Sequence, residues 1–252
     1  DHLTSLGVTH LELMPVAEFP GRRGWGYDGV SLFAPHSGYG GPDGLKRLVN
    51  ACHERGLAVL LDVVYNHLGP SGNYLDQFGP YFTDTYHTPW GKAVNLDQAG
   101  SAEVREFFFD NALMWLRDYH FDGLRLDAVH AYFDQSAYHF LEELSDRIAQ
   151  FNAIGGRSCV LIAESDLADP RTTRSREAFG QGMDAQWCDD LHHAIHAELT
   201  GEREGYYADY GGVARIAEAL QHGFVFRGHF SPFRKRKHGH PTQSPRLGRL
   251  LG

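Results

Sequence analysis

The segment from Gly123 to His130 places charged side chains inside an apolar stretch, so it is a natural place to look for chemistry. Its alternation of apolar and polar residues predicts a β-strand, in which Arg125 and Asp127 share one face and the neighbouring leucines the other. Because a buried unpaired charge is costly, the arginine and the carboxylate must pair with each other or bind a polar ligand. This segment alone leaves both a structural ion pair and a functional site open.

Other polar residues follow predicted strands in the same way. Asn66 and His67 come directly after one apolar strand, and Glu164 ends another. In barrels of alternating strands and helices, the carboxyl ends of the strands carry the catalytic residues. Independent ion pairs in a core have no reason to gather at one end of a sheet, so the placement of Asp127 and Glu164 favours a functional role.

Two carboxylates that face one cavity can hydrolyse a glycosidic bond. One attacks the anomeric carbon, and the other first protonates the leaving oxygen and later activates water. Arg125 would keep Asp127 ionised, so Asp127 fits the nucleophile, whereas the apolar residues before Glu164 favour a protonated acid/base. Spacing alone does not separate this chemistry from other reactions of two carboxylates.

The elements that must position these residues alternate between strands and helices. Strands are predicted at residues 9–14, 29–34, 57–64, 123–127, 160–163 and 182–187. Helices are predicted at about 43–56, 101–119, 136–151, 189–201 and 213–220, the second of them capped by Ser101. Such apolar strands indicate a parallel sheet covered by helices. We therefore expect an α/β fold that is a partial (β/α)8 TIM barrel, about its first six β/α units, with no seventh or eighth strand.

One long stretch interrupts the alternation. Residues 66–98 are rich in glycine, proline and aromatic residues and show neither the helical nor the strand period, which predicts a loop insertion at about 66–100 after the third strand. Aromatic faces suit sugar rings, and packing of the loop onto the domain is the simpler use. Near the C-terminus, the basic run from Arg234 to Lys237 predicts a solvated surface loop.

Composition argues against several functional classes. A net charge of -9 over 252 residues argues against a nucleic-acid binder, and no apolar run approaches the length of a membrane span. Three widely spaced cysteines, Cys52, Cys159 and Cys188, fit reduced thiols of a cytoplasmic protein. The chain begins without a methionine, inside a predicted helix, so we expect residues 1–252 to form one incomplete catalytic domain.

Three segments, in this order, resemble signature regions of the α-amylase family of glycoside hydrolases: Asp62–His67, Gly123–Asp127 and Ala163–Glu164. The resemblance covers nearly the whole chain and is greatest to those members of the family that release trehalose. The other segments that carry it are Glu12–Val16, Gly26–Val30, Tyr39–Leu45, Asn66–Tyr74, Ala163–Arg171, Asp184–His193 and Leu199–Tyr207.

The resemblance implies a retaining hydrolase that cleaves the α-1,4 bond next to the trehalose end of maltooligosyltrehalose. By motif match, Asp127 is the nucleophile, Glu164 the acid/base and Arg125 the residue that orients Asp127. Tyr27 would stack on the glucose at the cleavage point and His67 would bind its hydroxyls. The other candidates for substrate binding are Asp62, which also fits a structural partner of Arg125, and Asn66, His130, Asp189, Asp190, His192 and His193.

The alternatives are a branching or debranching enzyme on the same barrel and a non-catalytic glucan-binding fragment. The family's third carboxylate follows a histidine, and no His-Asp pair occurs in this sequence, so we expect the chain alone to be inactive.

The partner that we expect is maltooligosyltrehalose or a related α-glucan, with no nucleic acid and no membrane. His192 and His196 lie one helical turn apart beside two aspartates, a pattern that fits a metal site as well as a sugar-binding edge. Hydroxyl recognition needs no metal, so we expect neither a metal nor another cofactor.

Overall fold

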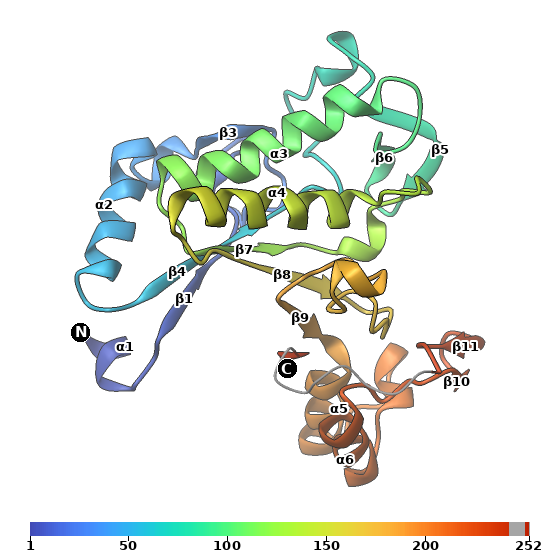
Figure 1. The fold of residues 1–252 in the computed structure, drawn as a ribbon. Coiled ribbons are helices and arrows are strands. Elements are labelled where there is room, and N and C mark those ends of the chain that lie inside the picture. Colours follow the sequence, from blue (N-terminus) through green and yellow to red (C-terminus); the bar gives the residue numbers. More distant parts are fainter. Residues whose placement is uncertain (242–249, 252) are drawn as a thin grey trace. The chain divides into compact units, whose positions relative to one another are not determined.

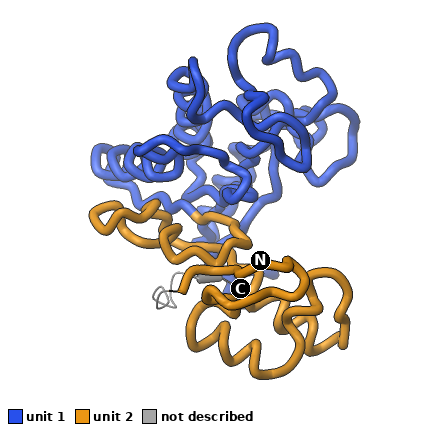
Figure 2. The backbone as a smooth tube through the Cα atoms, turned by 90° about the vertical axis from the view of Figure 1, so that its right-hand side faces the viewer, with its two compact units in different colours: residues 1–161 blue, residues 162–252 orange. Residues whose placement is uncertain are grey.

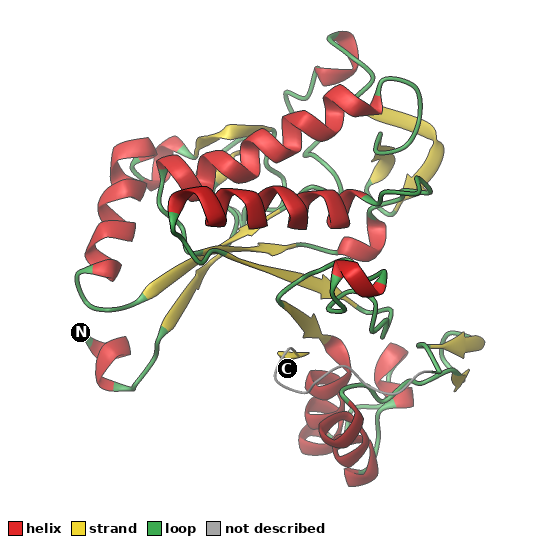
Figure 3. Ribbon diagram, in the orientation of Figure 1, coloured by secondary structure: helices red, strands yellow, loops and turns green. Residues whose placement is uncertain are grey.

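The structure is a computed structural model that describes residues 1–241, 250 and 251. The chain divides into two compact units, residues 1–161 and 162–252 (Figure 2). Strands and helices alternate along both units (Figure 3). This alternation confirms the α/β class.

The first unit is built on parallel strands. They are β1 (His10–Leu13), β4 (Ala58–Val63), β7 (Gly123–Leu126) and the beginning of β8 (Val160–Ser165). β4 pairs with β1 on one side and with β7 on the other, in parallel. The last five residues of β4 are all buried, as expected for a strand covered on both faces.

The helices of this unit are α1 (His2–Ser5), α2 (Gly41–His53), α3 (Ser101–Asp118) and α4 (Phe140–Gly155), with short 3-10 helices η1 (Ser37–Tyr39), η2 (Leu75–Gln77) and η3 (Val129–Ala131). α3 and α4 run side by side (Figure 1), and the rings of Phe109 and Phe140 stack between them with centroids 5.0 Å apart. Each such buried aromatic side chain contributes roughly 1.5–3 kcal/mol to folding.

Two helices begin at residues other than those predicted. Gly100, with φ of 76°, is the N-cap of α3, so Ser101 is its first residue rather than its cap. α4 begins at Phe140 and not near residue 136, because the Asp134 carboxylate accepts the backbone N–H groups of Ser136 and Phe140 at 2.8 and 2.6 Å and holds the intervening residues in a turn.

Two segments of the first unit pair differently from the prediction. The strand expected at residues 29–34 is β3 (Ser31–Pro35), which pairs antiparallel with β2 (Ala17–Glu18) outside the parallel sheet. Its side chains alternate between exposed and buried, as in a strand with one wet face. The insertion at 66–100 is not all loop, since β5 (Phe82–Thr88) and β6 (Gly91–Val94) form an antiparallel hairpin in it.

The second unit continues the parallel pattern. β8 pairs with β9 (Ala185–Cys188), which pairs with β12 (Leu250–Leu251), all in parallel. β12 corrects the expectation that no further strand follows the sixth predicted one, because two residues of backbone pairing leave no periodic signal in a sequence. The remaining elements are η4 (Arg176–Ala178), α5 (Asp189–Thr200), η5 (Gly205–Asp209), α6 (Val213–His222), β10 (His229–Ser231) and β11 (Arg236–His238).

The basic run from Arg234 to Lys237 is not simply a solvated loop. Arg236–His238 form β11, which pairs with β10 in an antiparallel hairpin. The Arg234 side chain is only 13% exposed and forms an ion pair with Asp166 at 2.9 Å.

None of the helices in the described part of the chain has the length and the apolar character that a membrane span requires.

Candidate active site

Asp127 lies directly after β7, at the carboxyl end of the strand. Leu124 and Leu126 are fully buried, so the alternation of the strand turns Arg125 to the other face. Ala128 follows in the left-handed conformation, with φ of 44°, and turns the chain away from the sheet into η3. Asp127 is 9% exposed, as befits a group at the edge of a buried strand.

One guanidinium nitrogen joins two carboxylates. The register of β4 and β7 sets Asp62 beside Arg125, whose Nη1 donates to both oxygens of Asp62 at 2.8 and 2.9 Å and to Oδ1 of Asp127 at 2.9 Å. Asn66 Nδ2 donates to Oδ2 of Asp127 at 2.7 Å and to its carbonyl at 2.8 Å. Both carboxylate oxygens of Asp127 therefore accept a hydrogen bond, and charge-assisted bonds of this kind fix the orientation of the group.

Asp62 is a buried carboxylate that holds Arg125 and Tyr27. It is 3% exposed, and this burial raises the pKa of its carboxyl to about 6, although Arg125 acts in the opposite direction. Tyr27 Oη donates to Asp62 Oδ2 at 2.6 Å, and burial raises the pKa of the phenol above its usual value. Gly26 allows the close packing before Tyr27, because its φ is 93° and a Cβ would come within 2.0 Å of the Pro15 carbonyl.

His67 is wedged between Tyr27 and an indole. Its Nε2 faces the Tyr27 carbonyl at 3.0 Å, and its Nδ1 is hydrogen bonded to Asn66 Oδ1. Two acceptors suit an imidazolium, whereas burial acts in the opposite direction and lowers the pKa of His67. Trp90, in the turn between β5 and β6, stacks on His67 with centroids 4.7 Å apart and rings inclined by 9°.

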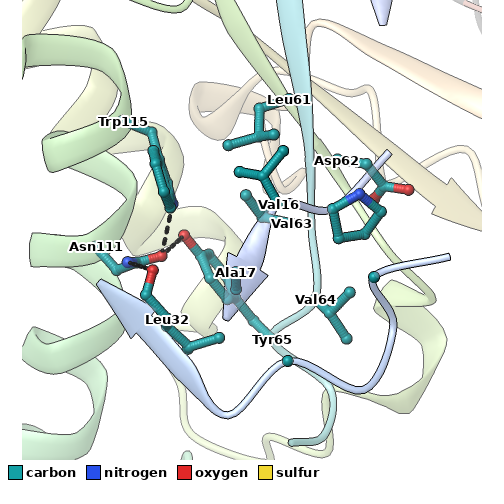
Figure 4. Close-up of a pocket in the computed structure, with 13 residues that line it drawn as sticks. Val16, Ala17, Leu32, Leu61, Asp62, Val63, Val64, Tyr65, Asn111 and Trp115 are labelled. Carbon is teal, nitrogen blue, oxygen red and sulfur yellow. Dashed lines mark hydrogen bonds between the residues drawn. The ribbon is translucent and has the colours of Figure 1, made fainter. Parts of the chain in front are cut away.

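A small cavity lies behind Asp62 (Figure 4). Its volume of about 20 Å³ holds about one water molecule and no sugar. Asn111 forms the hydrogen bonds at the polar side of this cavity (Figure 4). It accepts from Tyr65 Oη at 2.7 Å and from Trp115 Nε1 at 3.0 Å, and it donates to the Leu32 carbonyl at 2.8 Å. The strand that carries Asp62 is thereby anchored to α3.

Four residues of this region are not singled out by the sequence patterns. Asn111 and Trp115 belong to a predicted helix, where the pattern gives them no part in a site, and Trp90 is one aromatic residue among several in the predicted loop. The hydroxyl of Tyr132 is buried without a hydrogen-bond partner in the described part of the chain. The aromatic content of residues 66–98 is the one signal in the sequence that points toward Trp90.

In the second unit, Glu164 is the penultimate residue of β8. It is half-buried between the buried residues Ala163 and Ser165. Two residues further on, Asp166 pairs with Arg234, and its carbonyl accepts a hydrogen bond from His238 Nε2 at 2.7 Å. The β10–β11 hairpin is thus fastened to the end of the strand that carries Glu164.

Asp190, at the start of α5, is bonded inward. It is 3% exposed, and its carboxylate accepts Tyr210 Oη at 2.7 Å and the N–H groups of Val225 and Phe226 at 2.6 and 3.1 Å. Burial raises its pKa. These hydrogen bonds give Asp190 a structural role. The sugar contact predicted for Asp190 stays a prediction, and the groups around its carboxylate do not favour it.

The histidines of α5 lie among tyrosines. His193 packs against Tyr206 with ring centroids 4.5 Å apart, and burial lowers its pKa to about 4. Its Nδ1 is buried without a hydrogen-bond partner in the described part of the chain. His192 is exposed and stacks loosely on His196, with centroids 6.2 Å apart.

The structure therefore brings one group of predicted site residues together within the first unit. It consists of Tyr27, Asp62, Asn66, His67, Arg125 and Asp127. His130 is exposed in η3, just beyond Asp127. Glu164, Asp189, Asp190, His192 and His193 belong to the second unit. Across residues 1–241, 250 and 251, no group of three or more His, Cys, Asp or Glu side chains is arranged to hold a metal ion.

Sequence comparison relates this chain to glucan-processing enzymes. A family model for the α-amylase catalytic domain matches residues 1–87. The chain is 56% identical to a malto-oligosyltrehalose trehalohydrolase of Arthrobacter ramosus, over 96% of the chain and 42% of that protein. It is 52% identical to the enzyme of the same name from Saccharolobus solfataricus, over 95% of the chain and 42% of that protein. A 1,4-alpha-glucan branching enzyme of Burkholderia thailandensis is 37% identical over 74% of the chain and 25% of that protein.

Solved structures give the same relationship. An α-amylase-type protein of Salmonella typhimurium superposes with a TM-score of 0.86 and 41% identity, over 95% of this chain and 41% of that one. An α-amylase of Geobacillus thermoleovorans, at 21% identity and a TM-score of 0.67 over 88% of this chain and 49% of that one, shares the fold. These matches confirm the expected partial (β/α)8 barrel.

The chain spans about two fifths of the length of the curated relatives that it matches. For two of them, the matched region is 42% of the relative's length. The match to the Arthrobacter ramosus protein runs over 241 residues and so extends over both units. Over both of its units, the chain is therefore similar to a part of the catalytic barrel of α-amylase family proteins.

Proposed function

We propose that the full-length protein is a retaining glycoside hydrolase that cuts the α-1,4 bond next to the trehalose end of maltooligosyltrehalose and releases trehalose. The observation that carries this proposal is the clamp on Asp127, whose two oxygens are held by Arg125 and Asn66. A nucleophile must approach the anomeric carbon in one orientation, and such positioning lowers the barrier to reaction. The names of the relatives supply the substrate.

Asp127 would act first. Its carboxylate attacks the anomeric carbon and forms a glycosyl ester, while Glu164 gives its proton to the oxygen of the departing trehalose. Glu164 then takes a proton from water, the water oxygen attacks the anomeric carbon, and the ester bond to Asp127 breaks. The shortened glucan leaves with the same anomeric configuration that it had in the substrate.

The surroundings of Asp127 suit a glucose ring at the point of cleavage. Tyr27 is held to Asp62, and His67 is held between the Tyr27 carbonyl and Asn66, so both rings have fixed positions. The half-exposed indole of Trp90 extends this surface over His67. We assign sugar contact to Tyr27, His67 and Trp90, and a supporting role to Asp62.

Recognition of trehalose itself would depend on polar groups at the leaving-group side. Asp189, His192 and His193 remain the candidates for that side, with His130 as a further one. A site built around particular hydroxyls rejects ligands that lack them, because its own polar groups are then left unpaired. The three cysteines are free and buried, which fits the cytoplasmic location that we propose.

The experiment is a product analysis with the full-length protein. Maltotriosyltrehalose and maltopentaose are incubated separately with matched amounts of enzyme, and the products are separated by chromatography. We expect trehalose release from the first to be much faster than any cleavage of the second. A branching enzyme, represented among the relatives, would instead form α-1,6 links by transfer to a second glucan. Comparable cleavage of both oligosaccharides, or α-1,6 products, contradicts the proposal.

A further inference from the structure

A second, larger pocket lies wholly within the second unit, among side chains that have no part in the proposed reaction. Its volume is about 330 Å³, inside the range of roughly 300–1,000 Å³ that is usual for small-molecule sites. The residues that define its chemistry are Arg203, Asp209, Arg215, Phe226, Phe230 and Pro232.

The floor of this pocket is rigid. Asp209 is 6% exposed, and its carboxylate accepts hydrogen bonds from the Ser231 hydroxyl and from the Phe233 N–H, the latter at 3.3 Å. Phe226 is 1% exposed and meets the ring of Tyr210 edge-on, with centroids 5.7 Å apart. A pocket with such a floor is formed before any ligand arrives, which reduces the entropy lost on binding.

The position of Arg203 is also fixed. Its Nη1 donates to the Ala197 carbonyl, in the last turn of α5, and to the Glu202 carbonyl at 2.7 Å. The guanidinium lies so close to Gly211 that a Cβ there would come within 2.4 Å of Arg203 Nε. Glycine at position 211 therefore makes room for the arginine at the wall of the pocket.

The lining combines aromatic faces with both donors and acceptors. Phe230 is 59% exposed, and Pro232 adds a second apolar surface beside it. Arg203 and Arg215 supply N–H donors, and the Asp209 carboxylate supplies acceptor lone pairs. A sugar ring matches this mixture, because its C–H faces pack on aromatic rings and its adjacent hydroxyls both donate and accept.

An anion fits the same lining less well. Two arginines would attract phosphate, but Arg215 is already paired with Glu218 at 2.7 Å, and Asp209 adds a negative charge to the lining. The cationic surplus that a phosphate group needs is therefore absent from this described lining. Charge balance favours a neutral ligand.

We propose that this pocket binds one ring of a neutral saccharide, a terminal glucose unit of an α-glucan. The identification of glucose rests on the proposed function, whereas the preference for a neutral sugar rests on the lining alone. The site would hold a glucan by a group other than those that cleave it, and so add to the affinity of the protein for its substrate.

The test is a calorimetric titration of the full-length protein carrying Asp127→Asn, so that no bound sugar is turned over. Maltose is the probe, and the number of sites and their affinities are compared with the same protein carrying in addition Phe230→Ala or Arg215→Gln. We expect the background protein to show one more maltose site than the Phe230→Ala variant, and Arg215→Gln to weaken that site about tenfold. Phe179→Ala is the matched control, because that ring is 92% exposed and lies outside the pocket.

Phe230→Tyr keeps an aromatic face and should retain the site, which separates loss of the ring from loss of the fold; thermal unfolding of each variant provides a second check. An equal number of maltose sites in the Phe230→Ala and Phe179→Ala proteins overturns the proposal. Binding of inorganic phosphate that Arg215→Gln abolishes, with no maltose bound there, overturns it as well. Failure of the proposed hydrolysis would appear separately, as an absence of trehalose release with this maltose site intact.

Discussion

The orientation of Asp127 depends on two neighbouring side chains. Its oxygens are held by the Arg125 guanidinium and the Asn66 amide, from the same strand and from the end of the adjacent one. The same guanidinium also holds Asp62, so a single cation serves two carboxylates. In the reaction that we propose, Asp127 would attack the anomeric carbon and Asp62 would support Arg125.

Replacement of Asp127 by asparagine tests the first role. Asparagine has the same shape, but an amide cannot form the glycosyl ester, so we expect Asp127→Asn in the full-length protein to lower kcat by at least about 10³-fold. Steady-state hydrolysis of maltotriosyltrehalose is the measurement, and an unchanged thermal unfolding midpoint is the control. Activity within tenfold of the unmodified enzyme would exclude Asp127 as the nucleophile.

Replacement of Glu164 by glutamine tests the acid. We expect severe loss of activity on the natural substrate, and partial recovery with a substrate whose leaving group needs no proton, such as an aryl glycoside. The ratio of the two rates, before and after Glu164→Gln, is the quantity to measure. An equal loss on both substrates would mean that Glu164 does not act as the acid.

Asp62 makes a prediction about pH and stability. Its pKa is raised from 3.8 to about 6 in the folded protein by burial. Between pH 4 and pH 6 the folded state thus keeps a proton that the unfolded state has released, so the contribution of Asp62 to the free energy of unfolding falls as the pH rises.

Asp62→Asn removes this titration. The free energy of unfolding of the unmodified protein, minus that of the variant, should fall by roughly 2–3 kcal/mol from pH 4 to pH 6 and stay level above pH 7. Denaturant titrations at four pH values measure it. A difference that rises with pH would show instead that the Arg125 pair governs the ionisation of Asp62.

At the level of elements, the sequence predicts those strands and helices that have a clear apolar pattern of their own. The apolar runs of β4 and β8 and the amphipathic stripe of α3 confirm the α/β prediction, because each buries its own face. The pairing of β3 differs from the prediction because a short, mostly apolar run does not say which strand it pairs with. The β5–β6 hairpin escapes prediction because its polar threonines, aspartate and histidine resemble those of a loop.

Some residues of the candidate site can likewise be predicted from local sequence patterns, and others cannot. The ends of predicted strands locate Asp127, Glu164 and His67 from the sequence alone, since these residues are adjacent to the apolar runs. Trp90 and Asn111 depend on contacts between residues far apart in the chain, and no local pattern reports such contacts. Asp190 resembles a sugar ligand in the sequence because its burial by the segment around Val225 is equally long-range.

Asp190 supplies the prediction at this scale. Asp190→Ala would leave three buried donors without an acceptor, namely the Tyr210 hydroxyl and the backbone N–H groups of Val225 and Phe226. We therefore expect the free energy of unfolding to fall by about 2–4 kcal/mol. Chemical denaturation measures it, with Asp110→Ala on the exposed side of α3 as control, expected within about 0.5 kcal/mol. Unchanged stability together with an altered preference for trehalose would restore Asp190 as a substrate contact.

For the whole molecule, the chain spans about two fifths of the length of the relatives that it matches, so the chemistry that we propose is that of a full-length protein. The stereochemistry of the reaction is a property at that scale, because it depends on how far apart two carboxylates on different strands are held. Retaining glycosidases hold them about 5–5.5 Å apart, and inverting ones about 6.5–9.5 Å, since a water must fit between.

The proposed reaction therefore requires about 5–5.5 Å between the Asp127 and Glu164 carboxyl groups of the full-length protein, across one shared pocket. The consequence can be measured in solution. Proton NMR during the first minutes of hydrolysis of maltotriosyltrehalose should show the new reducing end of the glucan as the α anomer, which mutarotation then converts to the equilibrium mixture. The unreacted maltotriosyltrehalose serves as an internal reference, because it has no reducing end. Initial appearance of the β anomer would mean that water attacks directly, and the glycosyl ester on Asp127 would have to be abandoned.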